Sequence, residues 1–118
     1  MNIPHATHPE QAAMFDIDDT LIESRSGKRM ENVYALYKSV QNKGYKMIII
    51  TARPGYYENV IHTQEQLKAH NIYYDELVFT SSPGKSVYKK NSKYNYILSV
   101  GDMDTDLTDS TYAVKISI

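Results

Sequence analysis

The sequence contains no cysteine and no large excess of charge of either sign. Without cysteine, disulfides and thiolate ligands are excluded, so any metal must be held by oxygen or imidazole donors. Thirteen lysine and arginine residues stand against 14 aspartate and glutamate residues, giving a net charge of −1, which argues against a dedicated nucleic-acid-binding domain. No apolar run approaches the roughly 20 residues of a membrane-spanning helix.

The first eleven residues are polar and lack the hydrophobic segment of a secretory signal. They include Pro4 and Pro9, so we expect an irregular N-terminal segment over residues 1–11. A chain of 118 residues is expected to form one domain over residues 1–118. Cytoplasmic residence without a membrane partner is the default expectation.

The rest of the sequence alternates between short apolar runs and amphipathic segments. Apolar runs predict strands over residues 12–17, 47–50, 77–79, 96–100 and 112–116. Apolar residues spaced by three and four from Met30 to Val40 predict a helix that Gly44 ends, and further helices are expected over 57–70 and 85–92. This alternation is typical of an α/β fold with a mostly parallel, five-stranded sheet.

Polar residues follow three of these strands at their carboxyl ends. Asp16 and Asp18 close the first strand, Thr51 the second and Asp102 the fourth. Ligands of such sheets bind beyond the carboxyl ends of the strands, so we expect these side chains to converge. Two carboxylates 4 Å apart repel by about 4 kcal/mol at an effective dielectric near 20, so the cluster needs a cation. Oxygen ligands favour a hard divalent ion, most often Mg²⁺.

These residue types suit the hydrolysis of phosphate monoesters. Asp16 is the candidate nucleophile that forms an aspartyl-phosphate, and Asp18 the candidate acid and base. Thr51 and Lys85 would supply a hydroxyl and an ammonium to the transferring oxygens. Arg53 could clamp a substrate phosphate bidentately or cap its own loop.

Neighbouring polar residues are given structural roles. Asp19 is expected to cap a helix or a turn rather than to act in catalysis. Lys85 follows a turn and should open a helix near the site, so it is preferred over the lysines after it. Exposed positions are expected for Asp104, Asp109, Lys89, Lys90 and Lys93.

In their order along the chain, these residues resemble the motifs of phosphatases in the haloacid dehalogenase (HAD) superfamily. Residues 16–21, Asp-Ile-Asp-Asp-Thr-Leu, match the first motif, Asp-x-Asp-x-Thr-Leu. The strand ending in Thr51 matches the second, Lys85 the third, and Gly101 to Asp106 the fourth, Gly-Asp-x-x-x-Asp. Residues 51–54 and the run from Gly84 to Asp102 look most like the acid-phosphatase-type subfamily, and similar features occur in polynucleotide 3′-phosphatase domains.

The resemblance implies a three-layer, Rossmann-like fold. It also implies Mg²⁺ ligands from Asp16, from the backbone carbonyl of Asp18 and from Asp102, directly or through water. Asp106 would not bind the metal directly but would accept a hydrogen bond from a water or from Lys85 and so orient it.

The same resemblance indicates that no cap domain covers the site. Caps in this superfamily insert after the first motif or between the second and third. Only residues 23–29 are spare after the first motif, and one helix and one strand occupy most of residues 52–84. An open site suits a phosphate at the end of a large molecule, or a site roofed by another subunit. The basic residues 24–29 could touch a nucleic-acid backbone or remain solvated.

Three functions are therefore carried forward. The first is a Mg²⁺-dependent phosphomonoesterase acting on a small or nucleotide substrate, and the second a polynucleotide 3′-phosphatase. The third is a phosphoacceptor module without turnover, which is disfavoured because its aspartate would end the third strand, where Phe79 and Thr80 stand. A calcium loop starting at Asp102 is rejected because Leu107 and Ala113 occupy its glycine and glutamate positions.

Overall fold

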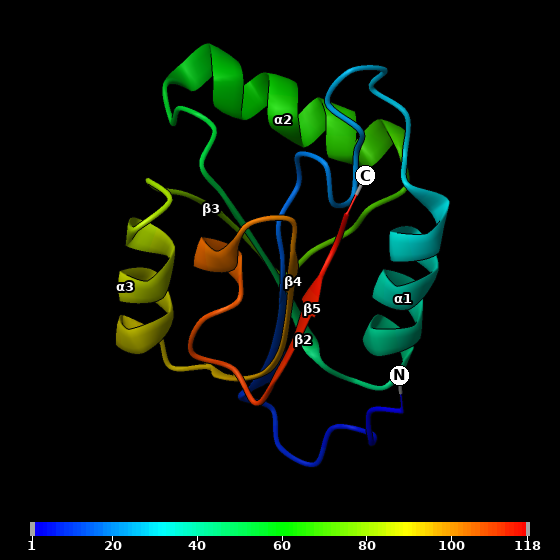
Figure 1. The fold of residues 1–118 in the computed structure, drawn as a ribbon, viewed down its shortest axis with the longest axis vertical. Helices are drawn as coiled ribbons and strands as arrows, with labels where there is room; N and C mark the ends of the chain where they lie inside the picture. The colour runs from blue at the N-terminus through cyan, green and yellow to red at the C-terminus, as the bar shows by residue number, and fades with distance from the viewer. Residues whose placement is uncertain (1, 118) are drawn as a thin grey trace.

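The computed structural model describes residues 2–117 and contains a five-stranded sheet flanked by helices (Figure 1). Its strands are β1 (Gln11–Phe15), β2 (Lys46–Thr51), β3 (Glu76–Phe79), β4 (Asn95–Gly101) and β5 (Tyr112–Lys115). Its helices are α1 (Glu31–Asn42), α2 (Tyr57–Ala69) and α3 (Gly84–Asn91), and a 3₁₀ turn, η1, covers Asp104–Asp106. The strand order is β3-β2-β1-β4-β5, and each neighbouring pair is parallel. The predicted α/β fold is confirmed, with a sheet that is parallel throughout.

The two faces of the sheet carry separate apolar cores. Side chains alternate between faces along a strand, so Phe15 and Ile49 meet α1 and α2 on one face, while Met14 and Ile48 lie on the face with Tyr88 of α3. Helices therefore cover both faces (Figure 1). Because β1 and β2 are buried on both faces, they read as continuous apolar runs in the sequence.

Helix α1 forms where the apolar spacing predicts it. Val33, Tyr37 and Val40 are its buried residues, and the Tyr37 ring packs edge-on against Phe15 with 4.9 Å between ring centroids. Burial of one such side chain contributes about 1.5–3 kcal/mol. The predicted C-terminal signal is also correct, because Gly44 adopts a φ of +91° just beyond the helix, a conformation that favours glycine.

The N-terminal segment is irregular, as expected, but it is tied to the body of the protein. Ile3 is buried in the core on the α1 face. Lys43 donates to the Ile3 carbonyl at 2.7 Å, and the Tyr45 hydroxyl donates to the Pro4 carbonyl at 2.7 Å. Regular structure begins at Gln11, and Met1 lies outside the described residues.

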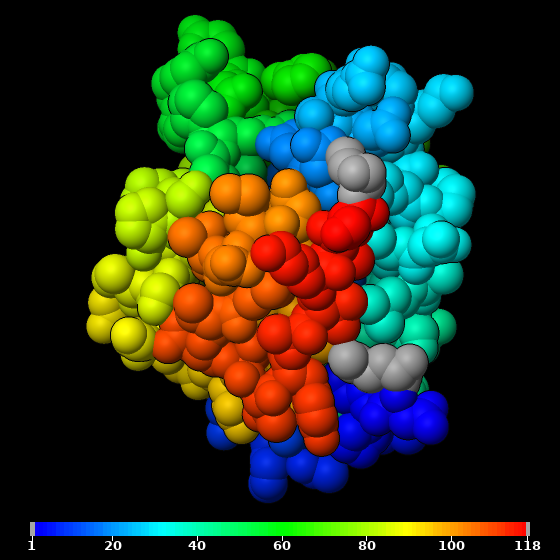
Figure 2. Space-filling view, in the orientation of Figure 1, coloured from blue at the N-terminus to red at the C-terminus, as the bar shows by residue number. Residues whose placement is uncertain are grey.

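The strand boundaries differ from the sequence prediction by at most two residues. Strand β1 ends at Phe15 rather than Ile17, although the Asp16 amide still donates to the Val100 carbonyl at 3.0 Å. The Asp16 backbone therefore remains bonded to β4, although the chain turns away from the sheet after Phe15. Strand β5 ends at Lys115, forms one edge of the sheet and is mostly exposed; it appears in red on the face shown in Figure 2. In residues 2–117, no helix is long and apolar enough to span a bilayer.

Candidate active site

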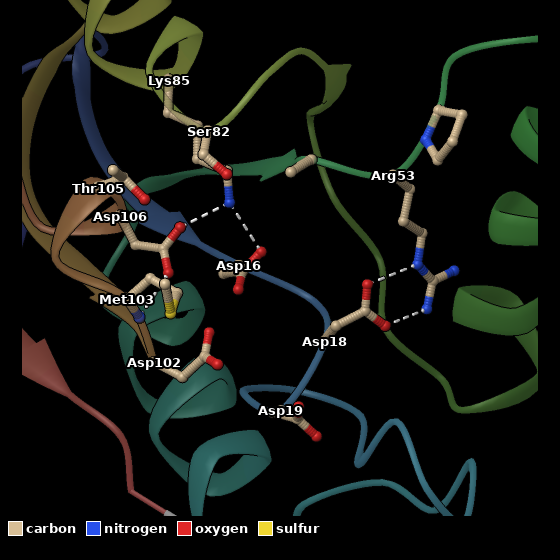
Figure 3. Close-up of a pocket in the computed structure, with 12 residues that line it drawn as sticks. Asp16, Asp18, Asp19, Arg53, Ser82, Lys85, Asp102, Met103, Thr105 and Asp106 are labelled. Atoms are coloured by element: carbon tan, nitrogen blue, oxygen red, sulfur yellow. Dashed lines mark hydrogen bonds and ion pairs between the residues drawn. The ribbon is translucent and has the colours of Figure 1, made fainter.

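The order of the strands brings the sequence-predicted residues to one rim. The chain runs outward from β1 to β2 and β3, then crosses back to place β4 on the other side of β1. The carboxyl ends of β1, β2 and β4 are therefore neighbours, and a cavity of about 390 Å³ opens there. Asp16, Asp18, Arg53, Lys85 and Asp102 all line it (Figure 3). The strand-end rule predicts this convergence for Asp16, Asp18 and Asp102, whereas Thr51, the fourth residue of that prediction, is not among the residues that line the cavity.

Lys85 lies at the buried end of the cavity between two carboxylates. Its ammonium donates to Asp16 at 2.9 Å and to Asp106 at 2.6 Å, and Lys85 is only 3% exposed. The ammonium reaches this point because Lys85 stands in the first turn of α3, after the Ser81–Pro83 turn. Buried charges in this arrangement are stable only as a group, because removal of one leaves the others unpaired.

The surroundings shift the pKa of both partners. Burial raises the pKa of Asp16 to about 7, with a further rise from Asp106 and Asp102, although the Lys85 ammonium opposes the change. Burial by itself lowers the pKa of Lys85, but the Asp16 and Asp106 carboxylates outweigh it and hold that pKa above its usual value. Lys85 therefore stays a cation, and an additional cation near Asp16 would stabilise the carboxylate form that a nucleophile requires.

Three carboxylates could hold a metal ion at this rim. Asp16, Asp102 and Asp106 each offer an oxygen, and these oxygens lie within 4.8 Å of one another. An all-oxygen donor set fits a hard divalent cation. The Asp18 carboxylate is turned away from this group (Figure 3), so a contact of Asp18 with the metal through its backbone carbonyl stays a prediction.

The Asp18 carboxylate is instead held by Arg53. The guanidinium donates from Nε at 3.0 Å and from Nη2 at 2.8 Å, which makes a bidentate pair. Its Nη1 donates to Thr63 Oγ1 at 3.1 Å and to Gln66 Oε1 at 2.8 Å, both on α2. Since a guanidinium has five N–H groups, one remains for another acceptor. The phosphate clamp expected of Arg53 stays a prediction.

Thr51 lies at the end of β2 but is fully buried. Its hydroxyl accepts the Arg53 amide N–H at 3.1 Å. In this position the hydroxyl shapes the turn that carries Arg53 toward Asp18. A contact between Thr51 and the transferring phosphoryl group stays a prediction.

The loop after Asp18 turns sharply and is fixed by its own side chains. Asp19 has a φ of +57°, and its carboxylate accepts the Ser24 amide at 2.9 Å and the Ser24 hydroxyl at 2.8 Å. The expected turn-capping role of Asp19 is confirmed. The chain then forms a short hairpin over residues 22–29, in which Glu23 N–H donates to the Lys28 carbonyl at 2.8 Å.

The acidic segment after β4 depends on a glycine. A Cβ at Gly101 would collide with the Asp106 side chain, so only glycine lets Asp106 fold back against the strand end. Asp106 is fully buried and also accepts the Met103 amide at 3.1 Å. The Gly-Asp-x-x-x-Asp spacing thus has a packing reason as well as a chemical one.

The prediction that Lys89 faces solvent is wrong. Lys89 is 3% exposed, and its ammonium donates to Ser99 Oγ at 2.9 Å and to the carbonyls of Asp106 and Thr108, each at 2.7 Å. Burial lowers the pKa of Lys89 to about 8. The missed signal is its spacing, since Lys85 and Lys89 are four residues apart and share one face of α3. Lys90 and Lys93 are exposed, as expected.

Other residues of the site carry no signal in the sequence. Ser82, Met103 and Thr105 line the cavity, and Thr63 is fully buried against Arg53. Of the expected surface aspartates, Asp104 pairs with Lys115 at 2.9 Å. Asp109, also exposed, accepts the Ser86 hydroxyl at 2.6 Å.

The two segments where a cap would insert hold little chain. After β1 only residues 16–30 precede α1, and between β2 and β3 the helix α2 is the one regular element in the described chain. The cavity is therefore open at the surface of the described protein, as the sequence predicts for a capless site.

The comparison with known protein families agrees with this geometry. Residues 21–117 match the family described as HAD superfamily, subfamily IIIB (acid phosphatase). The match covers well over half of the chain, so the protein belongs to this family and is a phosphatase. It begins after Asp16 and Asp18, so their roles rest on the motif and the geometry. No curated protein matches the chain significantly.

Proposed function

We propose that this phosphatase hydrolyses phosphate monoesters with Mg²⁺, through an aspartyl-phosphate formed on Asp16. The main support is that Asp16 reaches the floor of an open cavity where Lys85 and the carboxylates of Asp102 and Asp106 converge. An anionic nucleophile and a dianionic phosphoryl group can meet only where cations offset their repulsion. Lys85 is one such cation, and the carboxylate cluster has the donors to hold a second.

In the first step an Asp16 carboxylate oxygen attacks phosphorus, and the bond from phosphorus to the ester oxygen breaks. To act as the acid, Asp18 must carry a proton on one of the two oxygens that accept from Arg53, and it gives that proton to the departing alkoxide. In the second step Asp18, now a carboxylate, takes a proton from water as that water attacks the aspartyl-phosphate, which releases inorganic phosphate and regenerates Asp16.

The remaining residues position these groups. Lys85 binds the nucleophile and a phosphoryl oxygen, and Asp106 fixes the Lys85 ammonium from its other side. Asp16, Asp102 and Asp106 would hold Mg²⁺, with the Asp18 carbonyl completing the protein ligands. When bound, Mg²⁺ supplies positive charge that offsets the charge on the phosphoryl oxygens. Thr51 and the free N–H of Arg53 are the further donors proposed for the phosphate.

The direct test is the release of p-nitrophenol from p-nitrophenyl phosphate. We expect activity that needs Mg²⁺, stops with EDTA and falls by at least about 10³-fold in Asp16→Asn, because the amide is not a nucleophile. Asp104→Asn is the matched control, since Asp104 is an exposed carboxylate of the same acidic segment. Undiminished release by Asp16→Asn would sink the mechanism. Absence of release by the unaltered protein would revive the phosphoacceptor alternative.

A polynucleotide 3′-phosphatase is the second candidate, supported by the open cavity and by the basic hairpin beside it. One of its cations is already engaged, because Arg29 donates to Glu31 at 2.8 Å and to the His70 carbonyl at 2.6 Å. Arg25 and Lys28 are the exposed cations left on the hairpin. The test compares a 3′-phosphorylated oligonucleotide with nucleoside monophosphates, where a preference for the oligonucleotide that weakens with salt would favour this function.

A further inference from the structure

Lys89 is the second buried cation of helix α3, and it has no part in the mechanism above. Of the described residues, those that line the main cavity do not include Lys89. An ammonium has three N–H donors, and Lys89 uses all three, on Ser99 Oγ at 2.9 Å and on the carbonyls of Asp106 and Thr108 at 2.7 Å each. No donor is left for a substrate, so any role of Lys89 in the reaction must act through the groups that it holds.

The segment after β4 depends on this ammonium for its attachment to the rest of the protein. Helix α3 lies beside the 3₁₀ turn η1 of that segment (Figure 1). The other backbone hydrogen bonds of residues 103–110 close within the segment, as when the Asp106 N–H donates to the Met103 carbonyl at 3.0 Å. In residues 2–117, the hydrogen bonds that tie the backbone of 103–110 to another element all come from Lys89.

The two lysines of α3 hold Asp106 at both ends. Lys85 and Lys89 are one helical turn apart on the same face. The first donates to the Asp106 carboxylate at 2.6 Å, and the second to the Asp106 carbonyl at 2.7 Å. A shift of this segment would move Asp102 and Asp106 relative to Asp16, whose position is set by β1. The three-carboxylate cluster therefore depends on a contact that lies outside it.

Packing alone gives no reason for a lysine at this position. A buried ammonium loses its hydration, and that cost is offset only by full and well-directed hydrogen bonding. An apolar side chain would fill the same space without the cost. What the ammonium adds is a fixed direction for two carbonyls of the acidic segment. Such precision matters to Mg²⁺, which demands a near-ideal octahedral arrangement of its oxygen ligands.

We propose that Lys89 is a positioning residue for the metal site. Through the carbonyls of Asp106 and Thr108 it holds the acidic segment where Asp102 and Asp106 meet Asp16. The inference rests on the proposed metal-dependent mechanism and adds to it a residue that touches neither the metal nor the substrate.

The first experiment measures metal binding in the absence of substrate. Mn²⁺ is the probe, because it favours the same carboxylate and water ligands as Mg²⁺, and the free ion is followed by electron paramagnetic resonance. Lys89→Met is expected to raise the Kd for Mn²⁺ by about 10–100-fold, the usual effect of losing a group that orients metal ligands. Tyr88→Phe is the matched control, since Tyr88 neighbours Lys89 on α3 but its hydroxyl donates to Glu76 on β3. It should leave the Kd unchanged.

The second experiment separates metal binding from catalysis in the hydrolysis of p-nitrophenyl phosphate. In Lys89→Met the Mg²⁺ concentration that gives half of the maximal rate should rise by the same factor as the Kd for Mn²⁺. At saturating Mg²⁺ we expect kcat and KM to return to within about threefold of those of the unaltered protein, because the bound metal restores the cluster. A merely structural role would lower Tm and move neither metal constant.

A milder variant keeps the test decisive if Lys89→Met does not fold. Lys89→Gln retains an amide that can donate to a carbonyl, and it should raise the Kd for Mn²⁺ by about threefold or more. Near-ultraviolet circular dichroism verifies that each variant is folded at the temperature of the measurement.

The outcomes separate this inference from the proposed function. An unchanged Kd for Mn²⁺ in a folded Lys89→Met or Lys89→Gln protein, or an equal rise in Tyr88→Phe, overturns the positioning role while the phosphatase mechanism stands. Failure of the unaltered protein to bind Mn²⁺ overturns the metal-dependent mechanism, and this inference with it.

Discussion

Replacing Lys85 with methionine tests how strongly the buried ion group stabilises the fold. Methionine keeps most of the volume of the lysine stem but removes the ammonium. The Asp16 and Asp106 carboxylates, at 2.9 and 2.6 Å from that ammonium, then share a buried site without their cation. Breaking a buried pair by removing one partner costs about 3–5 kcal/mol.

The expected loss depends on pH, because a proton can replace the missing cation. Keeping one carboxyl protonated at pH 8, against an ordinary pKa of 3.8, costs about 6 kcal/mol, so protonation gives no relief and the full loss applies. At pH 5.5 the same protonation costs about 2 kcal/mol, so the variant can lose no more than about 2 kcal/mol of folding stability at this pH. For 118 residues, about 1 kcal/mol corresponds to about 4 °C in Tm.

The assay is thermal unfolding in EDTA, followed by circular dichroism at both pH values. We expect Lys85→Met to lower Tm by about 12–20 °C at pH 8 and by no more than about 8 °C at pH 5.5. Lys90→Met is the matched control, since Lys90 is exposed on the same helix and should change Tm little. A loss below about 1 kcal/mol at pH 8, or one equal to that of Lys90→Met, would refute the reasoning.

Three further predictions follow from contacts around the cavity. Because burial raises the pKa of Asp16 to about 7, the folded chain binds more protons than the unfolded one between pH 3.8 and 7, so metal-free stability should fall by up to about 4 kcal/mol as the pH rises through that window. Asp16→Asn should remove this fall when urea unfolding is compared at pH 4 and pH 8. An unchanged fall in the variant would contradict the assignment of the raised pKa to Asp16. Arg53→Lys keeps the positive charge but loses the two parallel hydrogen bonds to Asp18, so kcat for p-nitrophenyl phosphate should drop about tenfold with a small change in KM. A rise in KM larger than the drop in kcat would instead indicate that Arg53 binds the substrate phosphate. Lys89→Met leaves two buried acceptors, Ser99 Oγ and the Asp106 carbonyl, and the half-buried Thr108 carbonyl without the ammonium, so it should lower the free energy of unfolding by about 1–3 kcal/mol. Urea unfolding measures this loss, and a neutral result would mean that water replaces the ammonium.

Much of the site could be predicted because strand ends are visible in the sequence. The apolar runs before Asp16, Thr51 and Asp102 mark where each strand stops, and a parallel sheet brings such ends to one rim. Lys85 lies in the cavity for a related reason, since it opens a helix directly after a turn on the same side of the sheet.

The contacts that orient Asp18 could not be predicted in this way. Thr63 and Gln66 are ordinary polar residues of an amphipathic helix, and their approach to Arg53 depends on how α2 crosses the sheet. No local pattern encodes that crossing. Lys89 is a different case. Its four-residue spacing from Lys85 shows in the sequence that both lysines lie on the same face of α3, and this placement was a better guide than the usual preference of lysine for the surface.

The lysine pair on α3 has a consequence for how this protein can be altered. Lys85 and Lys89 reach across to the segment that follows β4, where they hold the side chain of Asp106 and the carbonyls of Asp106 and Thr108. The helix and that acidic segment therefore behave as one exchangeable part, although some ten residues of chain separate them. A chimera that replaces α3 alone would leave the Asp106 carboxylate and the two carbonyls without their lysine donors. One that moves α3 through Thr108 together would keep these contacts, and the receiving protein would need a carboxylate in the place of Asp16 to pair with Lys85.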